Sequence, residues 1–428
     1  MLQPLRIGIA GLGTVGVGVI KILRNKVELL RQRTGRKLVI TAVSARDARK
    51  DRGVVVSDYA WESDPVALAQ RDDVDIFVEL MGGHDGPALE ATKAALAAGK
   101  DVVTANKAML AHFGHELAIM AEEKAALIRF EAAVAGGIPV IKSLTEALAG
   151  NQISRVMGVM NGTCNYILTQ MQATGRGYDA LFEECAKLGY LEADPMLDVG
   201  GIDAGHKLSL LSAIAFGTRV DFDSIALEGI QHIALEDIEQ ADDMGYRIKL
   251  LGIAQMTDAG LEQRMSPCLV PKGSPIGQLE GGTNMVIIEG DEVGRIVLGG
   301  PGAGEGPTAS AVMSDIIEIS RGIRISTFGQ PANTLVKSEP SCSVTPAPYY
   351  IRLRLLDQPG ALAKIATVLG QEGVSIDRMR QYGHSEETAP VLIVTHTTDR
   401  TALDFAMKKM HKTNVLGGAP VAIRIENI

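Results

Sequence analysis

Residues 5–16 read LRIGIAGLGTVG, a short apolar stretch that runs into glycines at positions 11, 13 and 16. Leu5–Ala10 has the pattern of a buried strand, and Val17–Arg33 has the apolar period of an amphipathic helix. A glycine-rich turn between a strand and a helix lets the backbone approach a pyrophosphate at the helix N-terminus. The stretch therefore predicts a dinucleotide site, with an empty structural turn as the alternative. The cofactor-binding residues expected here are Gly11, Gly13, Thr14, Val15 and Gly16.

The alternation of strand and helix continues beyond this turn. We expect strands at Leu38–Ser44, Asp75–Met81 and Asp101–Thr104, with the alanine-rich helix Pro87–Ala98 before the last of them. This order predicts an α/β fold whose first domain, residues 1–132, is a Rossmann-type dinucleotide-binding domain with a parallel sheet. A glycine-rich loop at 299–309 leads into a helix, and residues 305–328 are expected to return to this domain.

The pattern changes after residue 132. Residues 133–304 mix helices and strands and predict an α+β domain for substrate binding and dimerisation. The helices expected there are Ile141–Ala149, Asp179–Leu188 and Ala204–Phe216, and the strands are Gln152–Val159, Leu261–Val270, Asn284–Glu289 and Arg295–Leu298. Residues 329–348 are rich in Pro, Ser and Thr and predict a linker. Residues 349–428 follow a βαββαβ order, which is typical of a ferredoxin-like module.

The composition favours small molecules and further copies of the chain as partners. The 428 residues carry a net charge of −9 without a face rich in Lys and Arg, so we expect no nucleic-acid partner. The 4 cysteines have neither the density nor the spacing of a disulfide scaffold, which favours a reducing, cytoplasmic location. No signal-peptide pattern is present and no apolar run approaches ~20 residues, so we expect no membrane partner.

Residues 191–216 read LEADPMLDVGGIDAGHKLSLLSAIAF, in which carboxylates and a lysine crowd the start of an apolar helix. Asp203 and Lys207 lie four residues apart and share one helical face, and Asp203 is also a plausible N-cap. A surface ion pair is the ordinary explanation of this spacing. The helix has no second polar face, however, and Gly200 and Gly201 precede it, so we predict a buried polar pocket.

The end of the second expected strand bears on the choice of coenzyme. An NAD site normally carries Asp or Glu there, for the ribose 2′-hydroxyl. Here Ser44 and Arg46 suit a 2′-phosphate better, so we favour NADP. Asp47 keeps NAD possible, and a loop whose charges are merely solvated is the remaining alternative.

Five motifs in the first half of the chain and one near its C-terminal end carry a family resemblance. They are GLGTVG at 11–16, TANK at 104–107, FEAAVAGGIPV at 130–140, GVMNGTCNYIL at 158–168, GIDAGHKLSLL at 201–211 and LLDQPGALAKIATVL at 355–369. With them the chain resembles homoserine dehydrogenase over nearly its whole length, and the last motif resembles the ACT domain of the long form of that enzyme. The resemblance implies reversible reduction of L-aspartate 4-semialdehyde to L-homoserine by NAD(P)H, on the route to threonine, methionine and isoleucine.

The resemblance also implies catalytic roles. Hydride transfer to an aldehyde leaves an alkoxide, which needs a proton and a nearby positive charge. Lys207 occupies the acid/base position, Asp203 would orient it, and Lys107 would join the substrate to the nicotinamide. Glu192 and Asp198 would hold the amino and hydroxyl groups of the substrate.

Two further sets of residues follow from the resemblance alone. One is a loop that folds against the cofactor, with Gly302, Gly304 and Glu305. The other is a sodium ion held by main-chain oxygens of Glu131, Val134, Gly136 and Ile138. Carbonyl ligands leave no side-chain signal in a sequence, so a plain turn is the alternative.

The turn at 357–360 precedes a helix whose free N–H groups can capture an amino-acid carboxylate. We therefore expect feedback binding of an end product, threonine or a related amino acid, through Asp357, Gly360 and Ala361. The alternative to feedback binding is that this module only assembles oligomers. The whole chain is expected to form a homodimer or homotetramer.

Three other functions remain open from the residues. Cys164 could act as a thiol nucleophile, although no histidine pattern supports a thiolate there. A sensor of dinucleotides and amino acids could use the same domains without catalysis, but it would not need the carboxylates and lysines together. A reductase of another amino-acid aldehyde is the closest rival.

Overall fold

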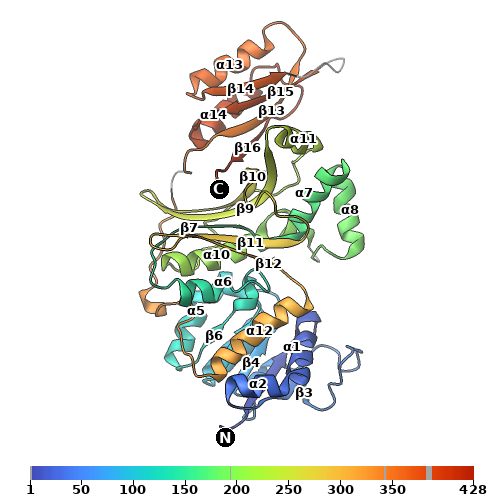
Figure 1. The fold of residues 1–428 in the computed structure, drawn as a ribbon, viewed down its shortest axis with the longest axis vertical. Coiled ribbons are helices and arrows are strands. Elements are labelled where there is room, and N and C mark those ends of the chain that lie inside the picture. The colour runs from blue at the N-terminus through green and yellow to red at the C-terminus, as the bar shows by residue number, and fades with distance from the viewer. Residues whose placement is uncertain (1, 193, 342–343, 382–387) are drawn as a thin grey trace.

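The computed structural model of the chain describes residues 2–192, 194–341, 344–381 and 388–428. Three tiers follow one another along the long axis of the molecule: a sheet near the N-terminus, a central sheet, and a C-terminal module (Figure 1). Among the described residues, no helix is both long enough and apolar enough to cross a membrane.

The first sheet is parallel throughout and has the strand order β3-β2-β1-β4-β5-β6. This is the doubly wound order of a Rossmann-type sheet, so the predicted α/β fold class is confirmed. Its strands are β1 (Leu5–Ala10), β2 (Leu38–Ser44), β3 (Ala60–Glu62), β4 (Ile76–Glu79), β5 (Asp101–Thr104) and β6 (Ile128–Arg129). The helices around it are α1 (Thr14–Asn25), α2 (Val27–Thr34), α3 (Pro65–Gln70), α4 (Pro87–Ala97), α5 (Lys107–Glu123) and α12 (Glu305–Ser320).

The single helix predicted over Val17–Arg33 is wrong. The structure has two helices there, because the backbone of Lys26 leaves the helical region with φ −121° and ψ 27°. α12 comes from much later in the chain but packs along α1, and both contribute to the same apolar core.

The central sheet contains β12 (Gly294–Pro301), β11 (Thr283–Gly290), β7 (Ile153–Val159), β9 (Tyr246–Thr257) and β10 (Gly260–Pro271), in that order. The short β8 (Ala226–Leu227) pairs with β10. Sequence patterning did not predict β9, because it is buried on both faces over Ile248–Ala254 and its polar and apolar residues do not alternate there. The helices of this region are α6 (Val140–Lys142), α7 (Gly162–Thr174), α8 (Tyr178–Leu188), α9 (Pro195–Val199), α10 (Ile202–Phe216) and α11 (Leu235–Asp243).

The C-terminal module continues the central sheet. Its strand order is β16 (Val421–Ile425), β13 (Tyr349–Leu356), β15 (Thr388–Thr395) and β14 (Ile376–Gln381), with α13 (Ala361–Gln371) and α14 (Arg400–His411), which is the predicted ferredoxin-like arrangement. β16 runs parallel to β10 and pairs with it, Arg424 opposite Cys268 and Ile425 opposite Leu269. The module is therefore joined to the central region by strand pairing as well as by the chain.

The segment expected to be a linker is held by backbone hydrogen bonds over part of its length. Val336 N donates to Gly217 O at 3.2 Å, Arg219 N donates to Val336 O at 2.8 Å, and Leu261 N donates to Glu339 O at 2.9 Å. These partners lie far away in the sequence, so local composition could not reveal them.

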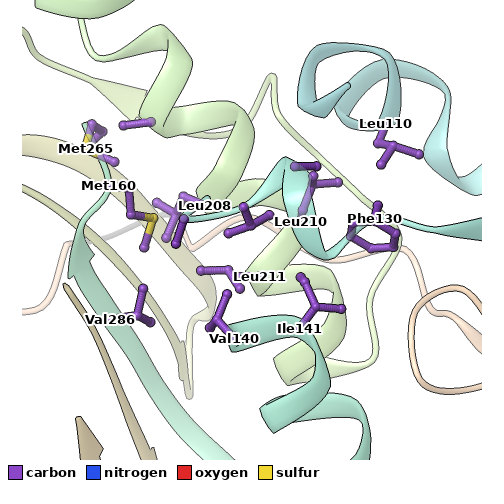
Figure 2. Close-up of a cluster of buried hydrophobic side chains, with 14 of the residues drawn as sticks. Leu110, Phe130, Val140, Ile141, Met160, Leu208, Leu210, Leu211, Met265 and Val286 are labelled. Atoms are coloured by element: carbon purple, nitrogen blue, oxygen red, sulfur yellow. The ribbon is translucent and has the colours of Figure 1, made fainter. Parts of the chain in front are cut away.

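α10 is the central helix of the core. In Figure 2, Leu208, Leu210 and Leu211 of this helix lie among apolar side chains from the central sheet, from α5 and α6, and from Phe130, which follows β6. Each such leucine contributes about 2 kcal/mol through burial. The suggestion that Asp203 caps this helix is wrong: the N-cap is Gly201, with φ 81°, and Asp203 lies in the first turn. Similarly, the helix predicted over Ile141–Ala149 is a short α6 followed by a π-helical turn, η2 (Ser143–Ala147).

Candidate active site

The glycine motif forms the turn between β1 and α1. A side chain at Gly11 would lie 2.3 Å from Leu80 O, and one at Gly16 would lie 2.1 Å from Gly11 O, so both positions require glycine for close packing. A Cβ at Gly13 would meet nothing within 4 Å. Because Gly13 is also the N-cap of α1 and no side chain caps that helix, the amides at its start face open space.

Lys107 is positioned by a buried hydrogen-bond network at the ends of β4 and β5. Thr104 Oγ1 donates to Glu79 Oε2 at 2.6 Å, and Asn106 Nδ2 donates to Gly83 O at 2.6 Å. Asn106 Oδ1 accepts a hydrogen bond from Met109 N at 3.0 Å and thereby caps α5, whose first residue is Lys107. The carboxyl ends of parallel strands are where open α/β sheets bind ligands.

Asp203 lies between two lysines. Its Oδ2 is 2.7 Å from Lys207 Nζ and its Oδ1 is 3.0 Å from Lys107 Nζ. Burial favours a higher pKa for Asp203, but the ammonium groups of Lys207 and Lys107 outweigh burial and hold the pKa well below its usual range. Asp203 in turn raises the pKa of Lys107. Lys207 Nζ also donates to Met160 O at 2.8 Å, which fixes the amine on both sides.

Asn161 connects the remaining carboxylates and was not singled out from the sequence. It caps α7, and its Nδ2 donates to Asp198 Oδ1 at 2.9 Å and to Asp203 Oδ2 at 3.2 Å. Asp198 Oδ2 accepts from Glu192 N at 2.8 Å, and Glu192 Oε1 lies 3.6 Å from Lys107 Nζ. An Asn just before a helix is a typical N-cap, and that signal was available in the sequence.

A cavity of about 930 Å³ joins this cluster to the glycine turn. Its walls include the following predicted residues: Val15, Lys107, Gly136, Glu192, Asp198, Asp203, Lys207, Gly302 and Gly304. They also include residues that the sequence analysis did not assign: Asn161, Gly162, Thr163, Tyr166, Tyr190, Gly281, Gly282, Asn284 and Thr308. The cavity is large enough for a nicotinamide and a small substrate side by side.

The structure does not bring every predicted cofactor residue to this cavity. Glu305 is not among its walls and instead pairs with Lys21 across α12 and α1, at 2.7 Å. Ser44 is buried, and Arg46 is exposed. Another guanidinium, that of Arg52, reaches the glycine turn and donates to Leu12 O at 3.2 Å.

The residues expected to hold sodium form a buried turn after β6. Ala135 and Gly136 have positive φ values of 56° and 57°. A side chain at Gly136 would lie 2.3 Å from Gly302 O, so the turn packs directly against the loop before α12. Within the described ranges, no group of three or more His, Cys, Asp or Glu side chains could hold a metal ion.

Cys164 is buried at the start of α7, where its Sγ donates to Asp198 O at 3.3 Å. Burial, together with the charge of Asp198, raises the pKa of this thiol well above its usual value. A thiol in this environment is a poor nucleophile, because the thiolate is the reactive form.

A second cavity, of about 550 Å³, lies in the C-terminal module at the start of α13. Asp357, Gly360 and Ala361 line it together with apolar residues that include Leu356, Ile376 and Met379. Gly360 is the N-cap of α13, with φ 83° and no side-chain cap.

Comparison with known proteins identifies the family of the chain. The profile for the NAD-binding domain of homoserine dehydrogenase matches residues 11–131, that for homoserine dehydrogenase matches 139–317, and that for the ACT domain matches 349–413. Homoserine dehydrogenases of Neisseria gonorrhoeae and Pseudomonas aeruginosa are 40% and 37% identical to the chain, each over 100% of both proteins.

Solved structures of homoserine dehydrogenases have the same overall fold as this chain. The crystal structure of a homoserine dehydrogenase from Thiobacillus denitrificans has a TM-score of 0.93 and 38% identity, and the match covers 99% of both chains. A hyperthermophilic archaeal homoserine dehydrogenase in complex with NADPH matches 74% of this chain and 97% of its own, with a TM-score of 0.63 and 28% identity. On this full-length similarity, the chain belongs to the homoserine dehydrogenase family, nucleotide-dependent oxidoreductases that act on a CH–OH group, and carries a C-terminal ACT domain.

Proposed function

We propose that the chain catalyses the reversible reduction of L-aspartate 4-semialdehyde to L-homoserine with NADPH, in the biosynthesis of threonine, methionine and isoleucine. The observation that carries this proposal is the placement of Asp203 between Lys107 and Lys207, in a cavity that reaches the glycine turn. The proposal assigns nucleotide binding to residues 1–132 with 305–328, substrate binding and dimerisation to 133–304, and regulation to 349–428.

The residues of the cavity divide the reaction between them. A nicotinamide coenzyme, held by its pyrophosphate at the glycine turn, would supply the hydride. Lys207 donates a proton to the carbonyl oxygen as negative charge develops on it, and the ammonium of Lys107 stabilises that charge. Asp203 keeps both amines oriented through its two oxygens. Glu192 and Asp198 bind the amino group that both substrates carry and the hydroxyl group of homoserine.

Two features support NADP over NAD. β2 ends in Ser44 and no carboxylate occupies that position, while Arg46 and Arg52 lie in the loop that follows. The archaeal relative was solved with NADPH. Measuring kcat/KM for both coenzymes tests this preference, and a higher value for NADH would contradict it.

Sodium binding through the main chain is part of the same proposal. Within the part of the chain that the structure describes, the carbonyl oxygens of Val134 and Gly136 accept no hydrogen bond from the protein, which fits main-chain coordination. Those of Glu131 and Ile138 accept from Val134 N and Val140 N, and each would use its second lone pair for the ion. These residues would hold the ion as a structural support of the turn beside Gly302. Thermal unfolding in sodium and in potassium salts of equal ionic strength tests this, and equal midpoints would contradict it.

Regulation and assembly are proposed from the ACT domain. The cavity at the start of α13 would bind an amino acid, with threonine as the first candidate, and the enzyme would work in the cytoplasm as a homodimer or homotetramer. Its apolar walls fit an aliphatic side chain, and the amides at the start of α13 fit a carboxylate. Titration of single amino acids against activity tests the effector, and indifference to all of them would contradict regulation.

The decisive experiment for the activity follows NADPH absorbance with aspartate semialdehyde. Consumption of NADPH and formation of homoserine are expected. Consumption only with a different amino-acid aldehyde would favour a related reductase, and nucleotide binding without turnover would favour a sensor.

A further inference from the structure

A lysine outside the catalytic cluster is buried close to it. Lys249 lies in β9 and is only 3% exposed. Its Nζ donates to Asn165 Oδ1 at 2.8 Å and to the carbonyl oxygen of Leu279. Within the described ranges, no carboxylate oxygen lies within ion-pair distance of this amine, so its acceptors are neutral.

The partners of Lys249 form one wall of the catalytic cavity. Asn165 is fully buried on α7, and its Nδ2 donates to Gly281 O at 2.8 Å. Lys249 and Asn165 together therefore hold two carbonyl groups of residues 279–282, the segment that precedes β11. Gly281 and Gly282 line the cavity that contains Asp203 and Lys207.

The same segment touches the start of α7. A side chain at Gly162 would lie 2.7 Å from Gly282 O, so the two backbones are in close contact. Asn161, the residue before Gly162, holds Asp198 and Asp203. A displacement of residues 279–282 would therefore change both the wall of the cavity and the support of its carboxylates.

Burying the ammonium group of Lys249 costs free energy, because the group loses its water. Burial and the neighbouring Arg247 lower the pKa of Lys249 to about 8, although the charge of Glu280 acts in the opposite direction. An apolar side chain of the same length would avoid the cost of burying the ammonium group. Such a side chain could not donate to Leu279 O or to Asn165, however, and would leave buried acceptors without partners. Lys249 is therefore needed at this position as a hydrogen-bond donor, and not to fill space in the core.

We infer that Lys249 is a positioning residue, which acts through Asn165 to hold residues 279–282 as the wall of the substrate part of the cavity. This inference rests on the proposed function, because it takes that cavity to be the place where the substrate binds. It separates Lys249 from the lysines that touch the reacting atoms. Loss of Lys249 should weaken substrate binding without removing the proton donor.

The test compares Lys249→Met and Asn165→Asp with the wild-type enzyme. Asn165→Asp keeps an acceptor for Lys249 but replaces the donor to Gly281 O, so it changes the wall while retaining the buried lysine. Both variants should raise the KM for aspartate semialdehyde about tenfold or more, with a much smaller change in kcat and in the KM for NADPH. Arg155→Met is the matched control: it removes a partly buried cation from β7 of the same sheet, which pairs with Glu426 and does not line the cavity. It should leave both KM values unchanged.

A second readout is independent of the reaction. Amide hydrogen exchange of residues 279–283 should accelerate in Lys249→Met and in Asn165→Asp. Exchange in β9 and β10 should not accelerate in either variant. If Lys249→Met does not fold, the substrate KM and the hydrogen exchange of Asn165→Asp alone test the inference. An unchanged substrate KM together with unchanged exchange would overturn the inference. If the wild-type enzyme does not reduce aspartate semialdehyde, the proposed function fails, and hydrogen exchange alone decides the role of Lys249.

Discussion

Arg352 of β13 and Asp237 of α11 form a buried bidentate ion pair between the ACT domain and the central region. Arg352 Nε lies 2.7 Å from Asp237 Oδ1, and Nη2 lies 3.1 Å from Oδ2. Tyr350 Oη donates to the same carboxylate at 3.0 Å, and Ala234 N donates to it at 2.9 Å. Together with the pairing of β16 and β10, this contact joins the regulatory module firmly to the catalytic part.

Replacing Arg352 by Met should destabilise the protein strongly. The change leaves the fully buried Asp237 carboxylate without its cation, which costs about 3 kcal/mol or more. Thermal unfolding should show a clearly lower midpoint. Asp243→Asn is the matched control at the same junction, because Asp243 pairs with Arg380 where both side chains are more than half exposed. Such pairs contribute little, so equal shifts in the two variants would contradict this account.

Two alanine substitutions in the glycine turn should separate coenzyme binding from folding. Gly13→Ala adds a side chain where nothing lies within 4 Å, and its φ of −79° suits alanine, so the protein should remain stable. The added methyl group should block approach to a pyrophosphate and raise the KM for NADPH. Gly16→Ala would place Cβ 2.1 Å from Gly11 O and should lower the unfolding midpoint. A Gly13→Ala enzyme with normal coenzyme KM would contradict nucleotide binding at this turn.

Cys164→Ala should leave turnover largely unchanged. The thiol is buried and has a raised pKa, so it does not serve as a nucleophile, and alanine removes only a small buried group. Steady-state rates with aspartate semialdehyde provide the measurement. A loss of several orders of magnitude would restore a thioester mechanism.

His206 should make the stability of the protein depend on pH. Burial and the nearby His112 lower its pKa from 6.5 to about 4. As the pH falls from 6.5 towards 4, the unfolded chain binds a proton at this position before the folded protein does, so stability decreases over that interval and this contribution levels off below it. His206→Gln should flatten this part of the curve of unfolding free energy against pH. An unchanged slope would contradict the assignment.

Much of the fold could be predicted from the sequence because local patterns determine it. The strand-turn-helix at 5–16 and the βαββαβ order of the C-terminal module follow from periodicity and glycine placement, and the structure has both. β9 could not be predicted, since its burial on both faces erases the alternation. The pairing of β16 with β10 joins residues far apart in sequence, which no local pattern shows.

In the candidate site, too, contacts within one element could be predicted and contacts between distant elements could not. The spacing of Asp203 and Lys207 predicts their contact within one helix, whereas the approach of Lys107 to Asp203 depends on how α5 packs against α10. Asn161 and Lys249 act by donating buried hydrogen bonds to acceptors that lie far away in the sequence. The order of residues along one chain carries no signal for such contacts beyond the N-cap pattern at Asn161.

The central claim is that Lys207 delivers the proton to the reduced carbonyl oxygen. Its most direct test is the rate of NADPH oxidation by Lys207→Met at saturating aspartate semialdehyde, with coenzyme binding measured separately and Lys187→Met, an exposed lysine of α8, as the control. The account predicts a fall in kcat of about a hundredfold to ten-thousandfold, an unchanged dissociation constant for NADPH and a normal control. A Lys207→Met enzyme that turns over at the wild-type rate would contradict it.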